Sequence, residues 1–321
     1  MGAIDQTASR LVADVGGTNT RIALYDPAND EYRALNTYRN QDYSDLEEIL
    51  AQWLNALKET HPLICCIAVA APPSTDRVNM INIAWSFSCA ELARQFGFIQ
   101  ASWLNDFQAN AYALPYLQDN ERVLLRPGSG QAGATLATMG PGTGLGGACL
   151  TSLAGVANAK DCEPGHMGLS PANALEMEIF SMLVPRFGEI HAERLVSGPG
   201  LLLLYLTLAE IRGAAPAAQS PAQVSTLALK GEDSIAVQAL QTFCALLGSA
   251  CGDFVLANGA YGGLYLAGGI VPQLLGFLSA SAFASRFREK GAMSAHLEAV
   301  PLYVITAPQP GLIGAAHAPI A

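Results

Sequence analysis

Positive charge is scarce in this sequence. Lysine and arginine together number 17, against 27 aspartates and glutamates, and the formal net charge is -10. A protein that binds nucleic acid neutralises phosphates with a basic face, so we expect no nucleic-acid partner. A nucleotide ligand is still compatible with this charge, because backbone N–H groups and a metal ion hold phosphates without many lysines.

Long apolar runs and signal patterns are also missing. The longest aliphatic run, 201–209, is too short to cross a bilayer and predicts a core helix. The first ten residues lack the basic and then apolar pattern of a secretory signal. The seven cysteines are odd in number and follow no disulfide spacing, which indicates reduced thiols. We therefore expect a cytoplasmic protein without a membrane partner.

Several motifs that would assign a function directly are absent. There is no G-x-x-x-x-G-K-[ST], which excludes an ordinary P-loop, and no G-x-S-x-G, which excludes the usual hydrolase elbow. Cys162 and His166 are spaced like metal ligands, but no second ligand pair accompanies them. We therefore predict no structural metal at these two residues.

The residues that are abundant predict a folded α/β protein. Hydrophobic residues make up 51% of the 321 residues and charged residues 14%, which suits a large core and about two domains. Ser44 and Glu47 predict a capping box that opens one helix, and Ser88 with Glu91 predicts a second helix closed by Gly97. In the first half we predict strands at 10–15, 20–26, 31–38, 63–71 and 98–104. The helix that Ser44 opens is predicted near 45–57.

The second half begins like the first, with a strand, a glycine turn and a strand at 134–152. Helices are expected at 172–185, 200–212 and 234–258, strands at 262–272 and 301–306, and a small-residue helix at the C-terminus. Two halves with the same start predict a duplicated α/β unit with a cleft between the two copies.

The stretch ADVGGTNTR, 13–21, allows two interpretations. Gly16-Gly17 forms an ordinary β-hairpin turn, because glycine accepts positive φ without strain. Alternatively, the glycines bring backbone amides against a phosphate, and Asp14 holds Mg²⁺ directly or through water. Thr18 and Thr143 would add hydroxyl contacts.

A dinucleotide site is disfavoured. Gly142, Gly144 and Gly147 match G-x-G-x-x-G, but the sequence after them, ACLTS, reads as a strand, whereas that fingerprint must open a helix. A dehydrogenase is therefore a distant alternative.

Six motifs together resemble the bacterial glucokinases of the hexokinase–actin-like superfamily, and the likeness runs nearly end to end. They are LVADVGGTNTRIALYD (11–26), LNDF (104–107), MGPGTGLGGA (139–148), EPGH (163–166), HAERLVSGPGL (191–201) and LAGGIVP (266–272). The zinc-binding cysteine cluster of related sugar kinases is missing. The resemblance implies an α/β fold with two domains of the ribonuclease H-like/actin-like type and a ligand cleft between them. It implies a small domain, 1–108, completed by a C-terminal helix, 306–321, and a large domain, 109–305.

The resemblance also implies a site and a reaction, the transfer of phosphate from ATP, with Mg²⁺, to the 6-hydroxyl of glucose. Asp106 aligns with the catalytic base, and the sugar ligands align with Asn105, Asp106, Glu163, His166 and Glu193. The nucleotide loops align with Asp14, Gly16, Gly17, Thr18 and Asn19, then Gly140, Gly142, Thr143 and Gly144, then Gly268 and Gly269. Asp14 is the expected Mg²⁺ residue, and a homodimer is expected.

Other interpretations remain for these residues. Asp106 alone would read as a helix N-cap, since DFQANAYAL follows it. Pro164 replaces the usual glycine of the family and restricts Glu163 before it. The substrate alternatives are another hexose, such as mannose or an N-acetylated amino sugar, and a sensor of sugar or nucleotide that does not catalyse.

Overall fold

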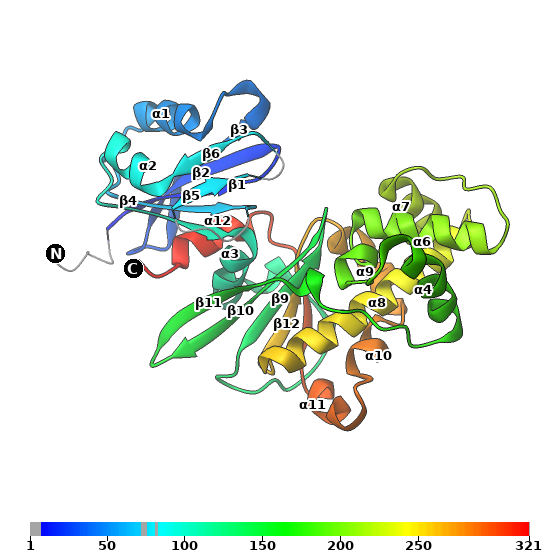
Figure 1. Ribbon diagram of the computed structural model, residues 1–321. Coiled ribbons are helices and arrows are strands. Elements are labelled where there is room, and N and C mark those ends of the chain that lie inside the picture. The colour runs from blue at the N-terminus through cyan, green and yellow to red at the C-terminus, as the bar shows by residue number, and fades with distance from the viewer. Residues whose placement is uncertain (1–7, 72–75, 81–82, 321) are drawn as a thin grey trace. The chain divides into compact units, whose positions relative to one another are not determined.

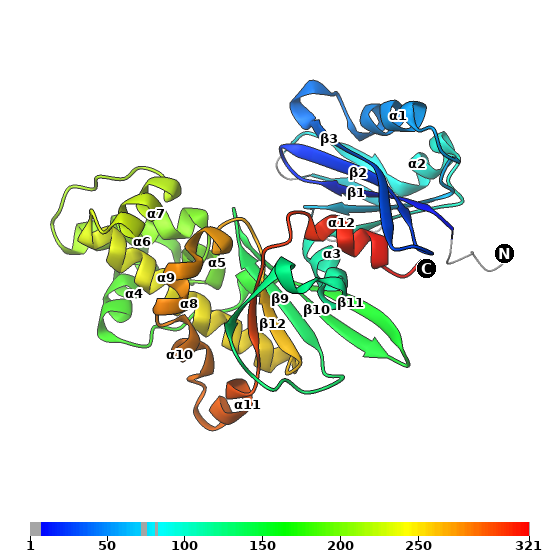
Figure 2. The ribbon, with the colours of Figure 1, turned by 180° about the vertical axis from the view of Figure 1, so that it is seen from behind.

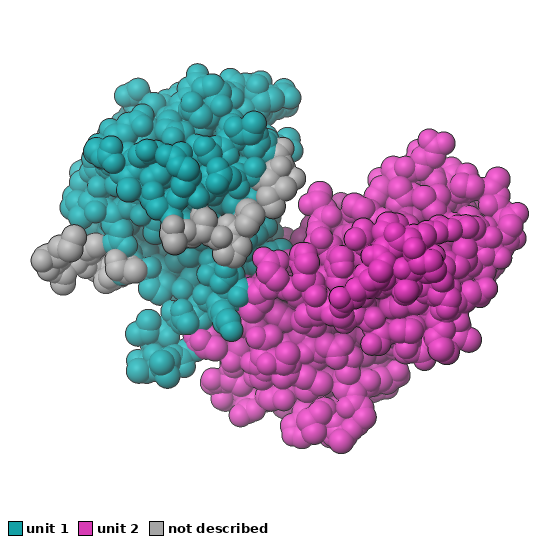
Figure 3. All heavy atoms as spheres, in the orientation of Figure 1, with its two compact units in different colours: residues 1–118, 152–161, 307–321 teal, residues 119–151, 162–306 magenta. Residues whose placement is uncertain are grey.

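The computed structural model describes residues 8–71, 76–80 and 83–320, and the chain divides into two compact units (Figure 3). Unit 1 contains Met1–Gln118, Ser152–Asp161 and Ala307–Ala321, and unit 2 contains Asp119–Thr151 and Cys162–Thr306. Each unit has its own hydrophobic core. The domain boundaries expected from the sequence, at 108 and 306, stay predictions.

Unit 1 is built on a five-stranded sheet with the order β3-β2-β1-β4-β7. Its strands are β1 (Arg10–Val15), β2 (Asn19–Asp26), β3 (Glu31–Arg39), β4 (Ile64–Val69) and β7 (Gln100–Asn105). The first three are antiparallel neighbours, whereas β1, β4 and β7 run parallel. A separate two-stranded sheet pairs β5 (Arg77–Asn79) with β6 (Ser86–Ser88).

The helices of unit 1 are α1 (Leu46–Ala56), α2 (Cys89–Phe96), α3 (Asp106–Ala113) and α12 (Pro310–His317). Ser88 caps α2 and Gly97, at φ +73°, ends it, as predicted. The predicted cap of α1 is wrong by one residue: Asp45, not Ser44, accepts the N–H of Glu48. The helix begins one residue later than predicted, at Leu46, and the Ser44 hydroxyl donates to the Glu48 carboxylate instead.

The C-terminal helix α12 packs against α3 and β1 within unit 1 (Figure 2). The contact is backbone to backbone: a Cβ added to Gly314 would overlap the carbonyl of Ala109. Small residues in GLIGAAHA therefore place the last helix beside the first strand, 300 residues earlier in the chain.

Unit 2 contributes most of a six-stranded sheet with the order β11-β10-β9-β12-β13-β8. Its strands are β8 (Arg122–Arg126), β9 (Leu136–Pro141), β10 (Leu145–Leu153), β11 (Val156–Cys162), β12 (Gly263–Leu266) and β13 (Leu302–Ile305). Strands β9, β12 and β13 are parallel, as β1, β4 and β7 are in unit 1. The strand order of unit 1 recurs from β11 to β13, so the predicted duplication is confirmed.

The helices of unit 2 include the longest of the chain. They are α4 (Ala174–Phe187), α5 (Ala192–Leu195), α6 (Gly198–Ile211), α7 (Pro221–Lys230), α8 (Ser234–Asn258), α9 (Leu275–Ala280), α10 (Phe283–Arg288) and α11 (Ser294–Glu298). By length and composition α8 would suit a membrane span, but 78% of its apolar window is buried here against the sheet and its neighbouring helices (Figure 1). That burial is typical of a core helix.

Short 3₁₀ helices complete the chain. They are η1 (Asn40–Asp42), η2 (Leu114–Tyr116), η3 (Asp119–Glu121), η4 (Pro164–His166), η5 (Val271–Leu274) and η6 (Gly291–Met293). Of these, η4 and η5 directly follow glycine- or glutamate-bearing loops that the sequence assigns to ligands.

Candidate active site

The glycine turn of unit 1 is a β-hairpin. Strands β1 and β2 pair in antiparallel register up to Val15 and Thr20, and the N–H of Gly16 donates to the carbonyl of Asn19 at 3.0 Å. The hairpin is therefore confirmed, but Gly16 does not use the positive φ that the sequence interpretation invoked. It leaves the phosphate interpretation open, because the turn that joins the strands presents the backbone of Gly17 and Thr18 at the sheet's edge.

Asp14 lies one residue before the end of β1, opposite Arg21. A carboxylate oxygen of Asp14 is 3.7 Å from a guanidinium nitrogen of Arg21, and 22% of the Asp14 side chain is exposed. Burial raises the pKa of Asp14 above its ordinary value of 3.8, and the charge of Arg21 opposes that rise. Arg21 is therefore the structural ion-pair partner of this acid.

The first turn of α12 lies against the same carboxylate. A Cβ added to Gly311 would come within 3.0 Å of Asp14 Cγ, so only glycine fits there without a shift. The N-terminus of a helix carries partial positive charge, which favours a carboxylate beside it. No sequence pattern connects Gly311 with Asp14, which lies 297 positions earlier.

Asn105 and Asp106 stand at the same edge of the sheet as Asp14. The parallel register aligns Asp14 with Ala68 of β4, and Ala68 with Leu104 of β7. Strands lie about 4.8 Å apart, so β1 and β7 are roughly 10 Å apart across β4. Both acids therefore sit at the carboxyl ends of parallel strands, where open α/β sheets bind ligands.

The N-cap of α3 is Asn105, so the interpretation of Asp106 as the cap is wrong. The Asn105 Oδ1 accepts the N–H of Phe107 at 2.9 Å, and its backbone N–H donates to the side chain of Gln108. The cap falls one residue earlier because the strand ends at Asn105 and its side chain reaches the first turn. Asp106 is the first helical residue and is half-buried.

The Asn105 side chain also anchors the strand. One of its two amide hydrogens is donated to the carbonyl of Ala71 at 3.0 Å. Its oxygen is already engaged by the cap. Any sugar contact from Asn105 therefore falls mainly on its remaining amide hydrogen, which makes it a donor to a hydroxyl.

The glycine turn of unit 2 joins β9 to β10. Pro141 pairs with Leu145, and Gly142 N–H donates to the carbonyl of Gly144 at 2.8 Å. The N–H of Gly198, the first residue of α6, donates to the carbonyl of Gly142 at 2.8 Å. The positive end of α6 thus lies beside this turn, as it does in many phosphate sites. A strand follows the turn, which bears out the rejection of a dinucleotide fingerprint.

The loop at Gly268 and Gly269 approaches the same turn. Gly268 has φ +90°, and an added Cβ would lie 2.7 Å from the carbonyl of Pro141. A Cβ on Gly140 would overlap the backbone of Ala267. The second and third predicted nucleotide loops therefore pack backbone to backbone, and side chains are excluded between them.

Glu193 lies beneath the second hairpin. Its Oε2 accepts the N–H of Leu145 at 2.8 Å, and a Cβ on Gly144 would overlap that oxygen. Gly165 leaves similar room, since its Cβ would lie 3.1 Å from the Cβ of Glu193. This carboxylate is half-buried and fixed, whereas the sequence alone suggested an exposed charge at a helix start.

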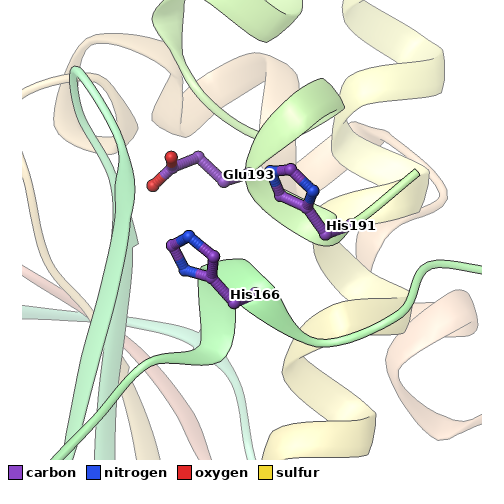
Figure 4. Close-up of side chains that lie close together, drawn as sticks. All are labelled: His166, His191 and Glu193. Carbon is purple, nitrogen blue, oxygen red and sulfur yellow. The ribbon is translucent and has the colours of Figure 1, made fainter. Parts of the chain in front are cut away.

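His166 lies near Glu193 and is exposed (Figure 4). Its ring stacks on His191, with centroids 5.3 Å apart and planes only 4° from parallel. Glu163 precedes η4 and is exposed. Of the three predicted sugar ligands in unit 2, the structure brings His166 and Glu193 together, with ligand atoms within 4.8 Å.

Comparison with known proteins now places the chain. A sequence model of the glucokinase family matches residues 11–320. Glucokinase from Chromobacterium violaceum is 43% identical over 309 residues, covering 96% of this chain and 88% of that protein, and the enzyme from Aromatoleum aromaticum is 38% identical over 313, covering 97% and 95%. The chain belongs to the glucokinase family.

Solved structures agree with this family. The crystal structure of glucokinase from an Antarctic psychrotroph superposes with a TM-score of 0.89 at 37% identity, covering 97% of this chain and 98% of that one. A ROK hexokinase from Thermus thermophilus shares the fold alone, at 18% identity and a TM-score of 0.68. The fold is thus the two-domain, actin-like architecture of sugar kinases.

Pro164, where the resemblance implied a glycine, fits its place. It is buried at the first position of η4, where a missing N–H costs nothing. Its ring packs on β10: a Cβ on Gly147 would lie 2.8 Å from Pro164 Cγ. The proline therefore fastens the loop bearing Glu163 and His166 to the second hairpin.

Sequence reasoning missed Asn40, which holds the first hairpin. Its Nδ2 donates to the carbonyl of Gly16 at 2.7 Å, its Oδ1 accepts the hydroxyl of Thr20 at 2.8 Å, and its N–H donates to the carbonyl of Thr18 at 2.9 Å. Only 4% of Asn40 is exposed. A cavity of about 730 Å³ opens beside it in unit 1. An asparagine after a strand gave no signal of this role, whereas Ser197 before Gly-Pro-Gly does signal the start of α6.

Proposed function

We propose that this protein is an ATP-dependent glucokinase that phosphorylates the 6-hydroxyl of glucose, with Asp106 as the general base. One observation supports the base above all: in a member of the glucokinase family, Asp106 directly follows the end of a parallel strand, level with the Asp14 hairpin. A sugar hydroxyl and a phosphate bound at that edge would be neighbours.

The proposed reaction requires no covalent bond between the protein and the phosphoryl group. The 6-hydroxyl is a poor nucleophile until its proton leaves, and a carboxylate within hydrogen-bond reach takes that proton in the transition state. Phosphoryl transfer otherwise depends on positioning and on stabilising charge. The first turn of α3 holds Asp106 rigidly for this purpose, since Asn105 and Gln108 close the capping box behind it.

Sugar recognition is proposed for Asn105, Glu163, His166 and Glu193. Together they offer donors and acceptors, which a polyhydroxy ligand needs in number. Glu193 is bonded to the second hairpin through Leu145. In this proposal the Glu193 carboxylate has two partners, a sugar hydroxyl and the backbone of the second glycine hairpin.

Nucleotide binding is proposed for the three glycine loops and Asp14. The donor chemistry of Asp14 fits Mg²⁺, which prefers oxygen ligands and keeps several waters. When bound, Mg²⁺ would neutralise charge on the transferred phosphoryl group. Gly140, Gly142, Gly144 and Gly268 leave the backbone bare, and the start of α6 adds positive potential.

The test is a coupled phosphorylation assay with Mg–ATP and a panel of hexoses, run for the wild type and Asp106→Asn. Asparagine keeps the size of the side chain and an acceptor for the Phe107 N–H, but cannot take a proton. We expect glucose to be the preferred sugar, and Asp106→Asn to lower kcat by about 10²- to 10⁴-fold with little change in glucose affinity.

Asp119→Asn is the matched control, because its side chain is 98% exposed, and its kcat should equal that of the wild type. Near-normal turnover in Asp106→Asn would reject the base. Turnover with mannose or an N-acetylated amino sugar instead would change the substrate. Sugar binding without transfer from any donor would indicate a sensor.

We also propose a cytoplasmic homodimer. The seven cysteines, all within the described residues, are thiols, which suits a reducing compartment. Helix α4 exposes Met177, Val184 and Phe187 along one face, with 54%, 49% and 42% of each residue accessible. An apolar face of this kind favours a second copy as its partner, and light scattering of the purified protein gives the mass that decides it.

A further inference from the structure

Three side chains with metal-binding atoms converge at the start of α5. His166, His191 and Glu193 each offer one ligand atom, and these atoms all lie within 4.8 Å of one another. Figure 4 shows the carboxylate of Glu193 and the two imidazole rings gathered beside η4 and α5. Sequence spacing singles out a different pair, Cys162 with His166, for which we predicted no structural metal.

His191 has no other evident task in this cluster. It occupies the N-cap position of α5, yet its side chain makes no capping hydrogen bond. Its backbone forms a bridge with Gly168, two residues after His166. That bridge is what brings two histidines, 25 positions apart, into a parallel stack.

The donor set selects the class of ion. Two imidazoles and one carboxylate suit zinc and similar transition metals, whereas Mg²⁺ prefers oxygen alone. Zinc binds such atoms at about 2.0–2.2 Å, so ligand atoms of one ion lie within roughly 4.3 Å of each other. One imidazole must turn out of the parallel stack before both rings can direct a nitrogen lone pair at one ion. Three ligands then leave a fourth position for water.

We propose that His166, His191 and Glu193 bind one divalent transition-metal ion, with zinc as the representative, and that the bound ion excludes the sugar. The second half rests on the proposed function, because His166 and Glu193 are the residues proposed to bind glucose hydroxyls. A micromolar zinc excess would then inhibit this enzyme, and glucose would relieve the inhibition.

The first experiment titrates the full-length protein with Zn²⁺ in a calorimeter, without nucleotide, and follows Co²⁺ by its visible absorption. We expect one site per chain, and at least 10-fold weaker binding in His191→Ala. This variant should keep its activity in metal-free buffer, since the His191 side chain neither caps α5 nor belongs to the proposed machinery. The matched controls are His296→Ala and Cys162→Ser, and both should bind zinc as the wild type does.

The second experiment repeats the titration with saturating glucose, and we expect the apparent zinc affinity to fall at least 10-fold. Absent zinc binding, or equal binding in His191→Ala, would overturn the metal site and leave the proposed function intact. Zinc binding that depends on His191 but ignores glucose would overturn the exclusion. Phosphorylation of glucose measured separately in metal-free buffer keeps that outcome distinct from a failure of the proposed function.

Discussion

The two glycine hairpins have the same place in their sheets but are held by different means. The β1–β2 hairpin of unit 1 is held by polar side chains: Asn40 bonds its turn, and Asp14 pairs with Arg21. The β9–β10 hairpin of unit 2 is packed mainly through bare backbone, with Gly140 against Ala267, and one side chain, Glu193, accepts the N–H of Leu145. Duplication has therefore kept the topology while the stabilising contacts diverged.

This difference separates the roles of the hairpins. Asp14 stands next to the closing pair of the first hairpin, opposite Arg21, and Gly140 holds the corresponding place in the second, opposite Gly146. A side chain at 140 would overlap the neighbouring strand, so the second hairpin has no room for an acid there. Of the two hairpins, only the first carries a carboxylate of its own, Asp14, that could bind a cation. The carboxylate beside the second hairpin is that of Glu193, which comes from α5.

The largest predicted effect follows from Gly140→Ala compared with Gly16→Ala. The added methyl at 140 meets the backbone of Ala267, which cannot move without disturbing β12, and we expect a loss of at least about 3 kcal/mol of stability. At Gly16 the nearest atom is the Asn19 carbonyl at 3.4 Å and the change should stay within about 1 kcal/mol. Urea unfolding and soluble yield of both variants measure this.

Equal stability of the two alanine variants would contradict the difference between the hairpins. It would mean that β12 yields to the methyl group as readily as an open turn does. A large loss at Gly16 alone would reverse the comparison and make the first hairpin the more tightly packed.

The next effect concerns the polar clamp, tested by Asn40→Ala. Two side-chain hydrogen bonds are lost and the Gly16 carbonyl is left without this donor, so we expect a loss of about 1–3 kcal/mol. The KM for Mg–ATP should rise more than the KM for glucose, because the turn belongs to the proposed nucleotide site. Asn36→Ala is the control, since that residue is exposed within β3, the strand that Asn40 follows.

Much of the fold could be predicted from sequence because its signals are local. The apolar run of α8 and the aliphatic residues of β1 predict their bounds, which agree with the structure at 234–258 and 10–15. Duplication followed from the two strand–glycine–strand starts. The short helices after α8 were missed, because six-residue helices such as α9 carry too few turns to show a period.

The residues of the candidate site also fall into those that sequence motifs identify and those that only the structure identifies. Residues that carry recognisable motifs, such as Asp106 and Glu193, were found through the family resemblance, and their roles remain predictions. Asn40, Gly311 and His191 act through partners 24 to 297 positions away, or in a stack made by a single backbone bridge. Contacts between residues so far apart in the sequence leave no local sequence pattern, so they become visible only in the structure.

The smallest effect has the opposite sign and concerns Asp14→Asn. Burial raises the pKa of Asp14, so the folded protein binds its proton more readily than the unfolded chain, and stability falls as pH rises from the ordinary value of 3.8 through the raised one. Above that pH window Asp14 is fully charged, and burial of the charge lowers the stability of the fold by its full amount. Asparagine removes it, so at neutral pH we expect Tm to rise by roughly 2 °C while Mg–ATP turnover is lost.

The pH series separates the contributions to this prediction. The gain in Tm should vanish below the ordinary pKa of the carboxyl, where the wild type is also neutral. A lower Tm for Asp14→Asn at neutral pH would instead mean that Arg21 and the start of α12 stabilise the charge by more than burial costs. The first hairpin would then hold its acid for stability as well as for the cation, and its contrast with the bare second hairpin would be wider still.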